Sequence, residues 1–432
     1  MTCIKWKPIR RRGSSFHDRR QGKRPGVGGH WCQDNHPEPL MSSVRLPTIG
    51  LLVLLVAPSV AEAGVGVEWN LRARHESVDD AALVHDASAQ TLRLRAAVRA
   101  ALGRGWTGLV EIEAIANAGN DYNSGSNGRS AWPSITDAKG SELNQAWLGW
   151  RGTKGAVTAG RQRIVLDNQR FIGNSGWRQN EQTFDAVVFE STPAKGLTFQ
   201  YAWLGRVHRV AGDEALDPWA RERRLSTSLL HATLDRSGQQ WTAYAYLHDD
   251  RDVAAASTAT YGLRWTRPPS AARHLGVSAE IARQTPYADN PGHFGHSYWL
   301  IEPALMTGGI TWKLGWEHLG ADNGHSLQTP LATLHAFNGW ADKFLVTPPD
   351  GLDDAYALAT GKIGKLTWTG SLHDYHSVVD SRRYGQEYDV SLALPLRAGW
   401  AGLVKFADYH SDGFARDTRK LWVQLEYAGS HP

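Results

Sequence analysis

Eighteen short segments in which apolar and polar residues alternate follow one another along this chain, and they limit its fold more than any other feature. Between Thr91 and Leu102, for example, Leu92 and Leu94 fall on one face and Arg93 and Arg95 on the other. This period of two is typical of β-strands. The segments begin near Val65, Thr91, Trp106, Ser141, Ala156, Phe184, Leu197, Leu225, Trp241, Thr258, Leu275, Tyr298, Ile310, Asp353, Leu366, Gln386, Trp400 and Lys420.

The connections between these segments are alternately long and short. Short ones include 103–105, 152–155, 192–196 and 236–240, and long ones include 118–140, 166–183, 205–224 and 320–352. Strict alternation is expected when both ends of a closed barrel lie in the periplasm, and a soluble β-sandwich or propeller has no reason to keep it. We therefore predict an all-β fold, a transmembrane antiparallel β-barrel of 18 strands with short periplasmic turns and longer extracellular loops.

The N-terminal region has the pattern of a secretion signal. Residues 41–63 contain Arg45, an apolar run over 51–57 that is too short to span a bilayer as a helix, and Ala61 and Ala63 just before Gly64. We predict a signal peptide over 41–63, an upstream extension from a start codon assigned too early over 1–40, and the barrel over 64–432. A basic arm that binds nucleic acid is the alternative for residues 1–40, and we expect no nucleic-acid partner.

Removal of residues 1–63 changes the net charge from basic to slightly acidic. This segment holds 10 of the 47 basic and 4 of the 43 acidic residues, which leaves 37 basic and 39 acidic residues in the mature chain. The basic isoelectric point therefore says nothing about partners. Both cysteines, Cys3 and Cys32, lie in the removed segment, so the exported chain needs no disulfides.

Tryptophan is abundant, with 19 residues in the chain. Many tryptophans lie near the ends of the predicted strands, where a barrel places an aromatic girdle at each membrane interface. Ordinary core aromatics of a soluble β protein are the alternative. The tryptophans expected in the girdle are Trp69, Trp106, Trp150, Trp203, Trp241, Trp265, Trp400 and Trp422.

The first two strands predict a basic patch on the inner wall. Antiparallel pairing places Arg72 and Arg74 beside Arg95 and Arg93, and it brings Arg95 close to Glu113 of the third strand. Charged ladders that neutralise each other are the alternative for any single residue. Four neighbouring guanidinium groups are less easily explained that way, because like charges side by side are unfavourable unless an anion passes.

The segment after residue 160 adds further candidates. Arg161 and Arg163 share a face, and we expect both to face the lumen because an Arg in lipid near mid-strand costs about 2 to 4 kcal/mol. This conflicts with the phase of Val157 and Ala159, for which a bulge is the only explanation we offer. The loop 166–183 is too polar and too long for a simple connector, which makes it a candidate for folding into the pore. The expected pore-lining residues also include Asp167, Asn168, Arg170, Arg178, Asp185, Glu111 and Glu113.

Three stretches resemble the alginate export family of outer-membrane porins. They are 160–186, which begins Gly-Arg-Gln-Arg-Ile-Val-Leu-Asp-Asn-Gln-Arg-Phe, then 329–354, with His-Ala-Phe-Asn-Gly-Trp-Ala-Asp-Lys-Phe, and 408–422. The resemblance implies an 18-stranded barrel that exports an anionic polysaccharide, with basic residues at a constriction and inward-folded loops beside it. Two features depart from the family pattern: the loops are short, and the chain runs five residues past Tyr427.

Together these features favour passive, charge-selective export of an anionic polysaccharide such as alginate across the bacterial outer membrane. A selective diffusion porin for small anions or sugars is the closer alternative, and a barrel hydrolase using Ser371, His373, Asp374 or His376 is the more distant one. We expect no enzyme, no cofactor and no metal, since the chain has neither a nucleotide loop nor an HExxH motif. The expected partners are the polysaccharide or a small anionic solute, outer-membrane lipid and lipopolysaccharide, the barrel-assembly machinery and periplasmic export components. A monomer is favoured.

Overall fold

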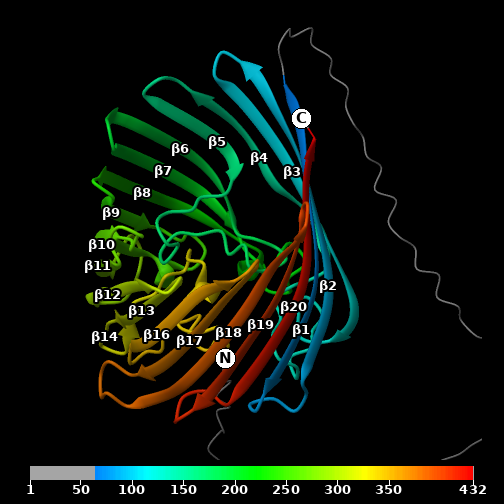
Figure 1. The fold of residues 1–432 in the computed structure, drawn as a ribbon, viewed down its shortest axis with the longest axis vertical. Helices are drawn as coiled ribbons and strands as arrows, with labels where there is room; N and C mark the ends of the chain where they lie inside the picture. The colour runs from blue at the N-terminus through cyan, green and yellow to red at the C-terminus, as the bar shows by residue number, and fades with distance from the viewer. Residues whose placement is uncertain (1–63, 432) are drawn as a thin grey trace, which may run out of the picture. The chain divides into compact units, whose positions relative to one another are not determined.

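The computed structural model describes residues 64–431, and these form one closed antiparallel sheet of eighteen strands (Figure 1). The predicted signal peptide and upstream extension lie outside the described residues. The strands of the sheet are β1 (Val65–Asp80), β2 (Ala87–Gly103), β3 (Trp106–Asp121), β4 (Gly140–Arg151), β5 (Gly155–Gln162), β6 (Thr183–Ala194), β7 (Leu197–His208), β8 (Glu222–Arg236), β9 (Gln239–His248), β10 (Thr258–Arg267), β11 (Leu275–Pro286), β12 (His296–Thr307), β13 (Ile310–Leu319), β16 (Leu352–Ile363), β17 (Leu366–His376), β18 (Arg383–Arg397), β19 (Trp400–Ser411) and β20 (Thr418–His431).

The barrel closes where the first strand meets the last. β1 pairs with β2 on one side and with β20 on the other, in a register that runs from Val67 opposite His431 to Asp80 opposite Thr418. Closure leaves no strand edge unpaired, which is the condition for a sheet to lie in lipid. The predicted number of strands and their antiparallel order are confirmed.

The alternation of residue types becomes an outer and an inner face. On β2, Leu94 and Val98 are exposed on the outside, whereas Arg93 is 1% exposed and Arg95 8% exposed on the inside. Successive side chains of a strand point to opposite faces, so an apolar outer wall and a charged inner wall require this pattern. Within residues 64–431, no helix has the length and apolar character needed to cross a membrane.

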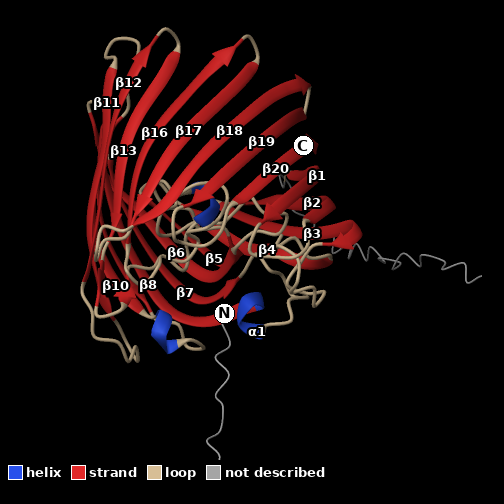
Figure 2. Ribbon diagram, turned by 90° about the horizontal axis from the view of Figure 1, so that it is seen from below, coloured by secondary structure: helices blue, strands red, loops and turns tan. Residues whose placement is uncertain are grey.

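The two ends of the barrel differ in their connections. The β2–β3 turn is tight, and Gly103, Arg104 and Gly105 all have positive φ values there, which Gly adopts without strain. At the opposite end, two long loops leave the rim and cross the space enclosed by the strands (Figure 2). The remaining elements lie in loops: α1 (Pro218–Arg221), the 3-10 turns η1 (Ala254–Ala256) and η2 (Leu334–Ala336), and the small hairpin β14 (Ala321–Asp322) and β15 (His325–Ser326).

The aromatic residues are divided between the two faces. Trp106, Trp150 and Trp241 are exposed on the outside near strand ends, as a girdle requires, whereas Trp203 is exposed in the middle of β7. Trp422 does not belong to this girdle, because its side chain is fully buried inside the barrel. The prediction for Trp422 is wrong because its place near a strand end does not fix its face; it shares a face with Lys420 and Gln424, which point into the lumen.

Candidate functional site

Two loops fold into the lumen and pair with each other. The first inward loop (163–182) connects β5 to β6, and the second inward loop (327–351) precedes β16. Ile172 and Leu331 form a parallel β-bridge, and the amide of Gly173 donates to the carbonyl of Leu331 at 2.9 Å. The amide of Thr333 donates to the carbonyl of Gln169 at 3.1 Å. The two loops therefore form one continuous layer across the barrel.

One side of the lumen is filled by apolar contacts with this layer. The ring of Phe171 lies 5.5 Å from that of Tyr244 and 5.2 Å from that of Tyr298, measured between centroids. Burial of aromatic surface of this kind is a large stabilising contribution. We call this region the apolar side; its inward wall residues include Leu204, Leu229, Tyr244, Tyr246, Tyr298 and Leu300 from β7, β8, β9 and β12.

The tip of the first inward loop reaches across to β1. The carbonyl of Trp177 accepts a hydrogen bond from Arg74 Nη2 at 2.6 Å, and Arg178 Nη1 donates to the Glu76 carboxylate at 3.1 Å. Burial alone would lower the pKa of Arg178, but the carboxylates of Glu76 and its neighbours outweigh burial and raise that pKa above its ordinary value. The tip is therefore fixed to the wall by charged hydrogen bonds.

A buried lysine joins the tip to the second inward loop. The ammonium of Lys405 on β19 lies 4.3 Å from the centroid of Trp177 and 3.7 Å from that of Trp340, and it donates to His335 Nε2 at 2.7 Å. The other ring nitrogen of His335, Nδ1, lies 2.6 Å from the Asp342 carboxylate. Because Nε2 accepts a hydrogen bond from Lys405, Nδ1 carries the imidazole proton and donates to Asp342.

The charges around His335 follow from burial and pairing. Burial lowers the pKa of His335 to about 3, so the imidazole is neutral at pH 7. Burial acts to raise the pKa of Asp342, but His335, Lys420 and Arg178 outweigh it and hold that pKa well below its usual range. Lys420 Nζ lies 2.7 Å from the Asp342 carboxylate. This arrangement keeps a neutral histidine between an ammonium group and a carboxylate.

On the side of the lumen opposite the apolar side, a cavity of about 670 Å³ lies between β1, β2, β20 and the first inward loop. We call it the charged cavity. Its charged lining residues are four arginines and four glutamates, namely Arg72, Arg93, Arg95, Arg163, Glu68, Glu111, Glu181 and Glu426. The predicted patch of like charge is thus interleaved with an equal number of carboxylates.

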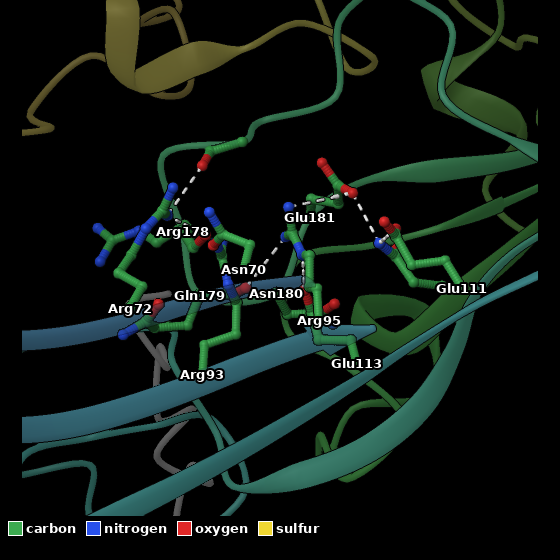
Figure 3. A network of polar contacts seen from close by, with 12 residues as sticks. Asn70, Arg72, Arg93, Arg95, Glu111, Glu113, Arg178, Gln179, Asn180 and Glu181 are labelled. Carbon is green, nitrogen blue, oxygen red and sulfur yellow. Dashed lines mark hydrogen bonds and ion pairs between the residues drawn. The ribbon is translucent and has the colours of Figure 1, made fainter. Parts of the chain in front are cut away.

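Most of these arginines have carboxylate partners (Figure 3). Arg95 Nε pairs with Glu113, and Arg95 Nη1 lies 3.3 Å from Glu181. Arg163 Nη2 donates to Glu111 at 2.6 Å, and its Nε donates to Glu181. Arg72 Nε lies 3.1 Å from Glu426, a residue that the sequence analysis did not single out. These pairs hold the guanidinium groups in fixed orientations at the cavity wall.

The register of β1 and β2 differs from the predicted one. Arg72 lies opposite Arg93, Arg74 lies opposite Thr91, and Asn70 lies opposite Arg95. The predicted proximity of Arg95 to Glu113 is confirmed. Arg99 lies 3.3 Å from Glu68 of β1. The offset is two residues, and it keeps each side chain on its predicted face because the side-chain period of a strand is two.

Arg161 and Arg163 do not share a face. Arg161 is in register with Ala146 and Asp185, in phase with Ala159, whose partner Leu148 is exposed on the outer wall. Arg161 Nε donates to Asp185 at 2.9 Å, so these two predicted lumen residues form an ion pair on the outward face. The prediction is wrong because Arg161 lies near a strand end, where an outward arginine costs only about 0 to 1 kcal/mol.

Of the remaining predicted residues of the first inward loop, Asp167 and Arg170 anchor it to the wall and Asn168 stabilises a turn within it. Asp167 accepts from His231 at 2.9 Å, Asn168 accepts the amide of Arg170 within a turn, and Arg170 donates to Glu317 at 2.6 Å. The structure places these groups away from the residues that line the charged cavity.

The residues considered for a hydrolase are paired with charged residues of neighbouring strands. Ser371 donates to Asp389 at 3.2 Å, His373 Nδ1 lies 2.9 Å from Asp354, and Asp374 accepts from Arg383. His373 Nε2 also lies 3.9 Å from Asp389, so Ser371 and His373 share that carboxylate. The Ser371 hydroxyl donates to the carboxylate and not to the imidazole, unlike a nucleophile with its base.

Comparison with known proteins gives a family match for the N-terminal part of the barrel and solved structures with a similar fold. A family model described as alginate export matches residues 65–277. No curated protein matches the chain.

Solved structures similar to this chain are outer-membrane barrels. OccAB2 of Acinetobacter baumannii is 12% identical with a TM-score of 0.68, over 85% of this chain and 98% of that one. OccK3 (OpdO) of Pseudomonas aeruginosa is 13% identical with a TM-score of 0.64, over 85% and 96%. OpdK of Pseudomonas aeruginosa, solved with vanillate, is 14% identical with a TM-score of 0.64, over 85% and 99%. At these identities the likeness concerns the fold.

Proposed function

We propose that the barrel exports an anionic polysaccharide such as alginate through its Arg-lined lumen, and the match of residues 65–277 to the alginate export family supports this. The chain is a passive channel of the bacterial outer membrane. The observation that carries the proposal is the charged cavity, in which Arg72, Arg93, Arg95 and Arg163 line one wall beside the first inward loop.

The chemistry of a uronate polymer suits this wall. Each sugar carries one carboxylate, and the planar fork of arginine binds carboxylates bidentately. The interleaved carboxylates, such as Glu426 beside Arg72, compete with the polymer for the guanidinium groups. Competition keeps each contact weak, and a chain passes only if binding is spread over several weak sites.

Ion selectivity tests this proposal. In planar bilayers under a salt gradient, the channel is expected to prefer chloride over potassium, and oligouronates are expected to block the current reversibly. Replacing Arg93 and Arg95 by Gln is expected to weaken both effects. Because charges are screened over about 8 to 10 Å at physiological ionic strength, the preference should decrease as salt rises toward about 1 M.

Two outcomes of that experiment would remove the polyanion as cargo. They are a preference for cations in the unmutated channel, and block by neutral oligosaccharides equal to block by uronates.

A second candidate is selective diffusion of small anionic solutes. The observation that favours it is the pair of inward loops, which fill the apolar side and leave the charged cavity as a restricted space. The similar barrel OpdK was solved with vanillate, a small carboxylate. Block times that lengthen with oligomer length favour the polymer, whereas equal block by monomers and oligomers favours the small solute.

A further inference from the structure

One guanidinium of the charged cavity has donors without partners among the described residues. Arg93 is 1% exposed, and neither its Nε nor its Nη1 has a hydrogen-bond acceptor within residues 64–431. Its Nη2 donates to the side-chain oxygen of Asn70 and lies 3.8 Å from Glu426. The other three arginines of the cavity have closer carboxylates.

The surroundings of Arg93 increase the cost of leaving these donors unpaired. Arg72 lies directly opposite Arg93 across the strand pair, and Arg95 follows two residues later on the same face. Like charges opposite each other are destabilising, and a buried charged donor without an acceptor is costly as well. An anionic group placed against Arg93 would remove both penalties.

The position of the cavity indicates the side from which that anion arrives. Its lining includes Glu68 near the start of β1, and Gly429 and Ser430 near the end of β20. These strand ends lie at the end of the barrel that carries the short turns, which is the periplasmic end. Asn174 and Glu181 of the first inward loop line the other boundary. The charged cavity therefore lies on the periplasmic side of the loop layer.

Building on the proposed function, we infer that Arg93 captures the carboxylate of a terminal uronate that arrives from the periplasm, so that the channel loads its polymer from one side. A volume of about 670 Å³ lies within the range of roughly 300 to 1,000 Å³ that is usual for small-molecule sites. A short chain end fits such a space. The free Nε–H and Nη1–H groups supply the donors that a carboxylate needs.

One-sided block tests this inference. The full barrel is inserted into planar bilayers from one chamber so that its orientation is uniform, and a tri-uronate is added to one side at a time. The rate of block from the short-turn side is expected to exceed that from the long-loop side. Inorganic phosphate and a neutral trisaccharide are added in parallel.

Two variants separate Arg93 from its surroundings. Arg93→Gln is expected to slow block from the short-turn side about tenfold, as expected for loss of a charge-assisted hydrogen bond. Arg151→Gln is the control, because Arg151 is exposed, pairs with Glu190 and lies outside the residues that line the charged cavity. This control is expected to retain one-sided block. Heat-modifiable gel mobility of both variants verifies that they fold.

The outcomes distinguish this inference from the proposed function. Equal block from both sides, or unchanged one-sided block in Arg93→Gln, would overturn the capture site while leaving a polyanion channel in place. Phosphate that blocks as well as the tri-uronate would show a site for inorganic anions and would also overturn it. Absence of uronate block from either side, in a channel that still prefers chloride, would remove the polymer cargo and the capture site with it.

Discussion

The two sides of the lumen hold the same loop layer by different forces. On the apolar side, Phe171 packs among Tyr244 and Tyr298, and the contacts depend on the removal of apolar surface from water. On the charged side, Arg95 of β2 pairs with Glu181 of the loop, Arg163 of the loop pairs with Glu111 of β3, and Arg178 is paired with Glu76. Dissolved ions screen partly exposed ion pairs and weaken them as salt rises, whereas apolar contacts have no charge to screen.

We expect the apolar side mainly to hold the loop layer in place and the charged side mainly to contact the transported solute. The apolar side holds the loop layer by aromatic packing and by the buried ion pair between Arg170 of the loop and Glu317 of β13, and burial shields these contacts from a passing solute. The charged side presents guanidinium groups whose carboxylate partners can be replaced by the carboxylates of a substrate. We therefore expect changes on the apolar side to alter stability and pore size, and changes on the charged side to alter selectivity.

Deleting Asn168 to Gln179 is expected to have the largest effect, because it removes the segment of the first inward loop that joins the apolar side to the charged side. With less of the loop layer in the lumen, single-channel conductance is expected to rise about twofold or more. Deleting residues 289–292, in the loop between β11 and β12, is the control and should leave conductance unchanged. Unchanged conductance in the long deletion would place the first inward loop outside the permeation path.

Phe171→Ala tests the apolar side alone. Phe171 is 9% exposed, and truncation of a buried phenylalanine costs about 3 to 5 kcal/mol. The midpoint of unfolding in urea, followed by heat-modifiable mobility, is expected to fall while ion selectivity stays the same. Phe189→Ala is the matched control, since Phe189 is half exposed on the outer wall. Equal shifts for both variants would contradict the anchoring role of the apolar side.

Acid is expected to loosen the loop tip through His335. Its folded-state pKa is lowered to about 3, whereas an unfolded histidine titrates near 6.5. Between these values the unfolded chain binds a proton that the folded chain does not, so stability falls as the pH drops from about 6.5 toward about 3. The slope for one such group is at most about 1.4 kcal/mol per pH unit.

The pH experiment compares unfolding midpoints of the wild type and His335→Phe between pH 4 and pH 8. The variant keeps a ring to stack on Trp177 but cannot bind the proton. Asp342 does not contribute to the slope between pH 4 and pH 8, because its lowered pKa keeps it ionised over this range. Its contribution to the free energy of unfolding is lost only in stronger acid. Identical slopes for the two proteins would show that His335 does not control the acid response.

Much of the barrel could be predicted from the sequence because the alternation of residue types within each strand shows which side chains face lipid and which face the lumen. The alternation of Leu94 with Arg93 and Arg95 is local, so it predicts both strand and face without any knowledge of neighbours. Alternation cannot give the register, and the Arg72–Arg93 pairing differs from the predicted one for that reason. Trp422 shows a second limit, since an aromatic residue near a strand end can serve the girdle or the lumen.

The candidate site was predictable only in part, because its partners are distant in the sequence. Glu426 reaches Arg72 only because the last strand closes on the first, and Lys405 reaches His335 only because the second inward loop folds back. Barrel closure could have suggested Glu426 as a neighbour of β1. No local pattern marks Lys405, because its aromatic partners Trp177 and Trp340 come from two loops far away in the chain.

The smallest effect is expected for an arginine on the outward face of the wall, and a neighbouring arginine of the charged cavity serves as the comparison. Arg161→Gln removes an ion pair with Asp185 on the outward face, so it should cost at most about 1 kcal/mol and leave the preference for anions unchanged. Arg163→Gln, two residues later, removes a cation of the charged cavity and frees Glu111 and Glu181, so it should lower that preference. Reversal potentials under a salt gradient measure both variants. If Arg161→Gln shifted the reversal potential as far as Arg163→Gln, the face on which an arginine lies would not determine its effect on permeation, and the separation of the charged cavity from the outer wall would be lost.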